Sequence, residues 1–130
     1  MAQGINPNGL KAPFGAFSNA AWAPPGRTLH ISGQVGTDAD GKLVGEGDIG
    51  AQTEQTLRNI EAILRSAGGT FDDIVAVTVF VTDMRGLAAI HEVRRKFFKP
   101  PYPASTLVEI KSLVDPRYLI EINAIAVIAA

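Results

Sequence analysis

Glu121 is the acidic residue whose surroundings point most directly to chemistry. It lies within an apolar run near the C-terminus, Leu119–Ile125. A carboxylate there is either at a strand end in water or buried and paired. Burial would raise its pKa and suit it to general acid–base work or to orienting a water molecule. The alternative is a structural hydrogen bond or an ion pair across an interface, and the spacing favours neither.

The pair Ser32-Gly33 lies in a segment that alternates with strand periodicity. Glycine lets a ligand approach the backbone and serine offers a hydroxyl, although a simple β-bulge explains the pair equally well. The chain has two histidines, His30 and His91. We expect both on the surface of their elements, and we expect no metal centre.

A basic cluster, Arg94–Lys96 with Lys99, lies beside Phe97 and Phe98. Stacked aromatic and basic side chains can bind nucleic acid. We expect instead that the phenylalanines belong to the core and the charges to a solvated helix face. The net charge of −1 also argues against a general nucleic-acid binder.

The elements that must position these residues follow from hydrophobic spacing and turn signals. Asp48 is the expected N-cap of the first helix and Asp83 that of the second, and Gln52 is expected on the solvent side of the first. Strands are expected at Phe14–Trp22, Thr28–Val35, Lys42–Val44, Ile74–Val81, Thr106–Lys111 and Leu119–Ile128, and helices at Ile49–Ala67 and Leu87–Phe98.

Two helices cannot cover both faces of a sheet of about six strands, so we expect an α+β fold with both helices on one face. The strand segments Ile74–Val81 and Ile120–Ile128 carry apolar residues on both faces. A bare apolar face is rare on a soluble monomer, which predicts a homo-oligomer with sites between its subunits. The alternative is that loops and the N-terminal arm cover this face.

Composition sets the outer bounds. The 130 residues fit a single domain, 1–130, with an irregular arm at 1–13. The absence of cysteine excludes disulfides, cysteine-ligated metals and a cysteine nucleophile. No apolar run reaches the roughly 20 residues that span a bilayer, and the N-terminus lacks a signal-peptide pattern. We therefore expect a cytoplasmic protein with no membrane partner.

Eight segments, in order, resemble the reactive intermediate deaminase family (Rid, YjgF-type, also called L-PSP endoribonuclease-like). They are Phe14–Phe17, Ile31–Val35, Ala51–Thr53, Asn59-Ile60, Ala67–Gly69, Val77–Asp83, Tyr102–Thr106 and Ile120–Ala126. The resemblance implies a chorismate-mutase-like fold and a homotrimer with three interface sites. It also implies hydrolysis of reactive imines and enamines to carbonyl compounds and ammonia, with no metal or organic cofactor.

The family's site residues carry over by position. Its water-orienting glutamate matches Glu121, and its Ser-Gly pair matches Ser32 and Gly33. The strand amide that helps to hold the ligand is that of Leu107, and Thr106 is expected to bind substrate beside it.

The chain departs from the family at two positions. Ser105 stands where an arginine holds the substrate carboxylate, and Phe17 stands where tyrosine is common. A neutral serine cannot form the charge-assisted pair, so ordinary 2-imino acids are not the expected substrate. We expect Ser105 to bind a shifted substrate and Phe17 to form an apolar wall. Arg27 and Arg117 are the candidates to replace the missing cation.

Three functions follow from the resemblance. The first is an imine or enamine deaminase with a shifted substrate. The second is a non-catalytic small-ligand-binding or sensor protein on the same fold. The third, a ribonuclease or translation inhibitor, is disfavoured by the net charge and by the absence of a paired-histidine site.

Overall fold

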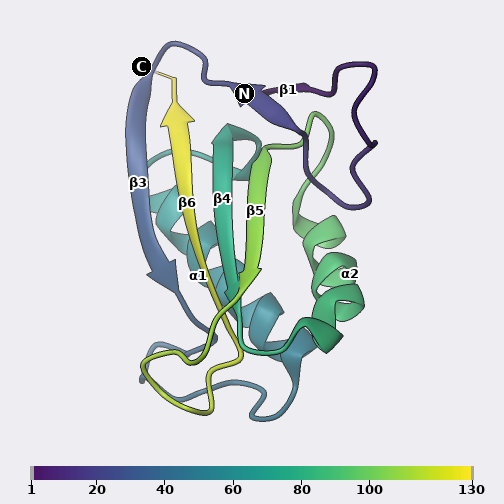
Figure 1. Cartoon of the computed structure of the whole chain (residues 1–130). Helices are drawn as coiled ribbons and strands as arrows, with labels where there is room; N and C mark the ends of the chain where they lie inside the picture. Colours follow the sequence, from purple (N-terminus) through teal and green to yellow (C-terminus); the bar gives the residue numbers. More distant parts are fainter. Residues whose placement is uncertain (1, 130) are drawn as a thin grey trace.

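The chain folds as a sheet with two helices on one face (Figure 1), and the computed structural model describes residues 2–129. The main sheet has four strands in the order β3-β6-β4-β5, and β1 and β2 form a separate pair. The strands are β1 (Gln3–Ile5), β2 (Ala20–Trp22), β3 (Arg27–Gln34), β4 (Ile74–Val81), β5 (Ala104–Glu109) and β6 (Ile120–Ile128). The helices are α1 (Ile49–Ser66) and α2 (Leu87–Phe97).

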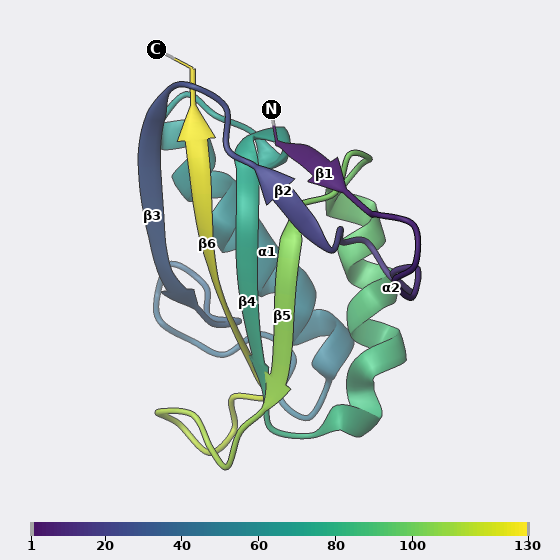
Figure 2. The same ribbon diagram turned by 45° about the horizontal axis from the view of Figure 1, so that its top comes forward.

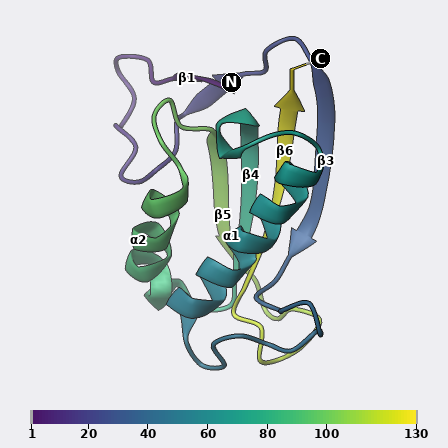
Figure 3. The ribbon, with the colours of Figure 1, turned by 180° about the vertical axis from the view of Figure 1, so that it is seen from behind.

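The predicted fold class is confirmed, since both helices pack on one face of a mixed sheet (Figure 3). β4 runs parallel to β5 and antiparallel to β6, which in turn runs antiparallel to β3. β4 is the uninterrupted β-branched run IVAVTVFV. Such a sequence suits a central strand that is covered on both faces.

The sequence led us to expect one sheet of about six strands. The six observed strands instead form two separate sheets. The arm expected to be irregular contains β1, and the expected strand at 14–22 shrinks to β2. Their pair lies across one end of the sheet face that the helices leave free (Figure 2). There Ala2 packs against Val75 and Val127. The arm thus covers part of this face, and we call the whole of it the open face.

Each helix begins at a capped turn. Asp48 caps α1 as predicted, accepting a hydrogen bond from the Ala51 amide at 3.0 Å. Asp83 does not cap α2 directly. It caps a short 3₁₀ turn, Met84–Gly86, from which α2 continues.

The core lies between the helices and the sheet, with Leu57, Ile60 and Leu64 of α1 fully buried. The expectation for Gln52 was wrong, because it is buried too. Its side-chain amide donates to the carbonyls of Gly45 and Arg117, and its oxygen accepts from the Leu119 amide at 2.9 Å. Buried polar groups are retained when they are hydrogen-bonded, and these bonds fix the loop leading into β6.

Lys42–Val44 does not form a strand, and only an isolated bridge joins Leu43 to Thr37. No helix within residues 2–129 is long and apolar enough to cross a membrane.

Candidate functional site

A pocket of about 290 Å³ lies between the edge strand β5 and helix α2. Three of the predicted site residues, Phe17, Ser105 and Leu107, line it together. Its other lining residues come from the N-terminal segment, the 3₁₀ turn and α2: Phe14, Met84, Leu87, His91 and Arg94. The pocket is therefore mostly apolar, with a few polar side chains, as is usual for small-molecule sites.

Arg94 supplies this pocket with a positive charge. Its side chain is only 1% exposed, which corrects the expectation of a solvated helix face. Its Nη2 donates to Ser105 Oγ at 3.0 Å, and its guanidinium carbon lies 5.7 Å from the centre of the Phe98 ring. Within residues 2–129 no carboxylate forms an ion pair with it. Burial lowers the pKa of Arg94 to about 10, so it stays charged at neutral pH.

His91 lies one helical turn before Arg94 and is also buried, at 5% exposure, although we expected it on the surface. Its ring stands edge-on to Phe14, with centroids 5.1 Å apart. Neither ring nitrogen has a hydrogen-bond partner among the described residues. Burial, followed by the charges of Arg94 and Arg95, lowers the pKa of His91. The ring is therefore neutral at pH 7, with unused hydrogen-bonding capacity at the pocket.

Local hydrogen bonds hold Phe17 beside β5. The hydroxyl of Ser18 donates to the Tyr102 carbonyl at 2.7 Å, and its amide donates to the Pro103 carbonyl at 2.8 Å. Phe17 stands edge-on to Phe14, with centroids 5.3 Å apart. The two rings form an apolar side of the pocket, in agreement with the wall expected for Phe17.

Glu121 lies elsewhere, on the open face. Its neighbours Ile120 and Ile122 are buried in the core, so the alternation of β6 turns Glu121 the other way. Its carboxylate lies against Gly33, where an added Cβ would come within 2.6 Å of Glu121 Cδ. Ser32 is also exposed on this side of the molecule.

The Ser32-Gly33 pair forms the β-bulge that the sequence left open. β3 and β6 pair regularly up to Ile31, lose register, and pair again at Gln34. Ser32 and Gly33 have no aligned partner in the β6 ladder, and bulges of this kind are found next to binding sites as well as at sheet edges. The bulge and the ligand-approach interpretations are therefore compatible.

Thr106 also points to the open face, because it alternates with Ser105 and Leu107 along β5. It pairs in register with Thr78 and is exposed. The predicted residues thus form two groups on opposite faces of the sheet. Phe17, Ser105 and Leu107 line the pocket beside α2, whereas Ser32, Gly33, Thr106 and Glu121 lie on the open side. One copy of the chain cannot bring the two groups together.

The arginines suggested by the sequence as replacements are not at the pocket. Arg117 is paired with Asp115 at 2.9 Å and with Glu46 at 3.5 Å. Arg27 is exposed and opens β3, at the opposite end of the strand from Gly33. The spacing of Leu87, His91 and Arg94 on one helix face was the signal that could have identified the buried arginine.

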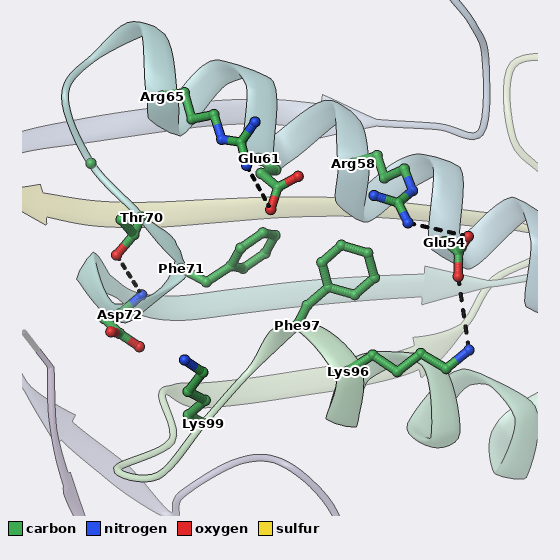
Figure 4. Close-up of a pocket in the computed structure, with 11 residues that line it drawn as sticks. Glu54, Arg58, Glu61, Arg65, Thr70, Phe71, Asp72, Lys96, Phe97 and Lys99 are labelled. Carbon is green, nitrogen blue, oxygen red and sulfur yellow. Dashed lines mark hydrogen bonds and ion pairs between the residues drawn. The ribbon is translucent and has the colours of Figure 1, made fainter.

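A larger groove of about 470 Å³ lies between α1 and the end of α2 (Figure 4). Five of its seven charged side chains are mutually paired: Glu54 contacts both Arg58 and Lys96, and Glu61 contacts Arg65. These side chains are largely exposed, so their pairs are screened by water. The groove also lacks all of the predicted site residues, and we do not assign the function to it. Residues 2–129 contain no group of three side chains suited to holding a metal ion.

Comparison with known proteins gives consistent matches. The sequence model of a family described as endoribonuclease L-PSP matches residues 9–128. A RutC family protein of Pyrococcus horikoshii is 41% identical over 114 residues, covering 88% of each chain. The protein DfrA of Myxococcus xanthus is 34% identical, covering 88% of this chain and 86% of that protein.

Solved structures agree with the sequence matches. The Rid family protein YyfB of Yersinia pestis superposes with a TM-score of 0.90 at 38% identity, covering 98% of each chain. RidA of an Antarctic Psychrobacter species gives a TM-score of 0.74 at 35% identity, covering 97% of this chain and 99% of that one.

Proposed function

Because the chain belongs to the endoribonuclease L-PSP family, which includes the Rid (YjgF) proteins, we propose that it hydrolyses a reactive imine or enamine to a carbonyl compound and ammonia. The reaction takes place where two copies of the chain meet, in a homotrimer. Glu121 is the catalytic residue, and neither a metal nor an organic cofactor takes part.

The opposed placement of the two residue groups supports this proposal most strongly. Ser105 lies beside α2, and Glu121 lies on the open face. A second copy that packs its open face against the β5 edge places its own Glu121 at the first copy's pocket. Cyclic symmetry then repeats the same site at every interface.

The chemistry needs one water and one proton shuttle. The oxygen of the water bonds to the imine carbon while the Glu121 carboxylate takes a proton from that water. Glu121 returns that proton to nitrogen, which gives a carbinolamine with a hydroxyl and an amino group on the same carbon. Glu121 then carries the hydroxyl proton to the amino nitrogen as the carbon–nitrogen bond breaks, so ammonia leaves and a carbonyl group stays behind. The backbone amides of Gly33 and Leu107, with Thr106, hold the substrate, and Phe17 shields it from water.

Ser105 separates this chain from members that carry arginine there. A serine hydroxyl cannot replace a bidentate guanidinium–carboxylate pair. The substrate is therefore held differently from an ordinary 2-imino acid.

Ammonia release from a panel of imines and enamines tests the proposal. The panel includes aminoacrylate-like and 2-aminomuconate-like compounds, and the wild type is compared with Glu121→Gln. We expect turnover to fall at least a hundredfold in the variant, because its amide cannot accept the water proton. No rate above buffer for any compound would contradict the proposal.

A non-catalytic binding protein on the same fold is the second candidate, favoured by the serine at position 105. Binding of a small ligand without any turnover would support it. The family description names an endoribonuclease, and salt-sensitive cleavage of RNA would support that third role.

A further inference from the structure

We propose that Arg94, on helix α2, is the anion-binding residue of this chain and that it selects a substrate whose carboxylate is separated from the reacting carbon by an apolar spacer. The identity of the reaction rests on the proposed function. The binding of the carboxylate does not, and it is tested separately.

The first support is a buried cation without a counterion. Arg94 is 1% exposed, and its one hydrogen bond to another side chain goes to the neutral hydroxyl of Ser105. Within residues 2–129 it forms no ion pair. Buried charges are normally paired, because transferring an isolated charge out of water is costly. A bound carboxylate would supply the missing partner.

The second support comes from His91. Both of its ring nitrogens are buried and unpartnered, and the side chain lines the same pocket as Arg94. A neutral imidazole can donate one hydrogen bond to a carboxylate oxygen that Arg94 also binds. Two side chains of α2, Arg94 and His91, thus have polar atoms in the same pocket that can bind a carboxylate.

The position of the guanidinium defines the substrate class. An arginine at position 105 would carry its guanidinium several bonds out from β5. Arg94 instead holds its guanidinium at the Ser105 hydroxyl, close to the strand. A carboxylate bound by Arg94 therefore lies nearer to β5 than one bound by an arginine at position 105. It also lies farther from the substrate carbon that the water on Glu121 of the second copy attacks. The rest of the pocket is largely apolar, including Phe17 and Leu107, and accepts the spacer.

Ligand binding measured by calorimetry on the full-length protein tests this inference with three stable probes. In levulinate two methylene carbons separate the carbonyl carbon from the carboxylate, whereas in pyruvate the carboxylate is bonded directly to the carbonyl carbon. The third probe, 2-pentanone, is a neutral ketone in which a methyl group replaces the carboxylate of levulinate. We expect levulinate to bind at least tenfold more tightly than either of the others. Equal binding of levulinate and 2-pentanone, or no binding of levulinate, would overturn the inference.

Variants assign the effect to one side chain. Arg94→Met should weaken levulinate binding at least tenfold, whereas Arg95→Met, a change at the exposed neighbour on the same helix, should leave it unchanged. The double variant Arg94→Met, Ser105→Arg moves the cation to β5 and should bind pyruvate more tightly than levulinate. Unchanged levulinate affinity in Arg94→Met would contradict the proposal.

Two controls separate the possible failures. Sedimentation checks that Arg94→Met keeps the assembly state of the wild type. A change of state would assign the guanidinium to the contact between copies and overturn the inference. Glu121→Gln should still bind levulinate more tightly than 2-pentanone, because that preference depends on Arg94. If Glu121→Gln also keeps full turnover, the proposed reaction fails while the binding inference stands.

Discussion

At the scale of single residues, the buried charge of Arg94 should lower the stability of the free protein, and the carboxylate that we propose it binds should restore that stability. Its lowered pKa shows that the protein interior disfavours the charged form. Binding sites typically contain groups that lower the stability of the ligand-free protein, and the bound ligand compensates for this loss.

We therefore expect Arg94→Met to be at least as stable as the wild type in the absence of ligand. The apolar side chain fills similar space without a buried charge, and such replacements are often neutral or stabilising by about 1–4 kcal/mol. Urea unfolding measures the difference. A loss greater than about 2 kcal/mol would show that another copy already pairs this guanidinium.

His91 gives the stability a pH dependence. Its pKa is lowered in the folded protein, so between that value and the ordinary value the unfolded chain binds more protons. The free energy of unfolding should therefore fall as the pH drops below about 6.5, and it should be fully recovered above that value.

Thermal unfolding at about pH 7.5 and about pH 5.5 measures this effect, with His91→Gln as the variant that cannot titrate. We expect the wild type to lose more stability than the variant on acidification. Equal losses in both proteins would assign the acid sensitivity to other groups.

At the scale of elements, the bulge in β3 leaves the space that the Glu121 carboxylate occupies, and we propose this carboxylate as the catalytic group. Gly33→Ala would place a methyl group against the Glu121 side chain. We expect turnover to fall at least tenfold while stability changes by less than about 1 kcal/mol, because Glu121 is partly exposed and can rotate away.

Thr28→Ala is the matched control, because it alters an exposed residue at the other end of β3 without crowding Glu121. Ammonia release and urea unfolding of both variants separate a displaced carboxylate from a damaged strand. Full activity in Gly33→Ala would show that Glu121 does not need its observed position.

The elements also show what can be predicted from the sequence and why. β4 was predicted to the residue and α1 to within one residue, because their periods and caps are local signals. Gln52 was placed wrongly because its partners, including Leu119, come from distant loops. Arg94 was missed for the same reason: residue type suggests solvent, and only the packing of α2 against β5 shows otherwise. The division of six strands into two sheets likewise depends on long-range pairing.

At the scale of the whole molecule, each proposed site uses Arg94 of one copy and Glu121 of the next. Mixing Arg94→Met, which is impaired in substrate binding, with Glu121→Gln, which is impaired in turnover, should therefore restore activity at low substrate concentration. A randomly mixed trimer that contains both variants has one intact site, so co-expression in equal amounts should recover about a quarter of wild-type turnover.

Each variant expressed alone is the control for this complementation, and sedimentation confirms the mixed assembly. Recovery would show that the two side chains act from different copies. No recovery in mixed trimers would place both functional groups in one subunit, against the opposed faces described above.

The separation of Ser105 and Glu121 by the thickness of a sheet has a consequence for working concentration. A lone subunit carries only half of each proposed catalytic centre, so specific activity should decline on dilution once subunits begin to dissociate. Substrate bridging two subunits should in turn slow their dissociation. The turnover per subunit would then depend on the concentration of the protein as well as on the concentration of the substrate.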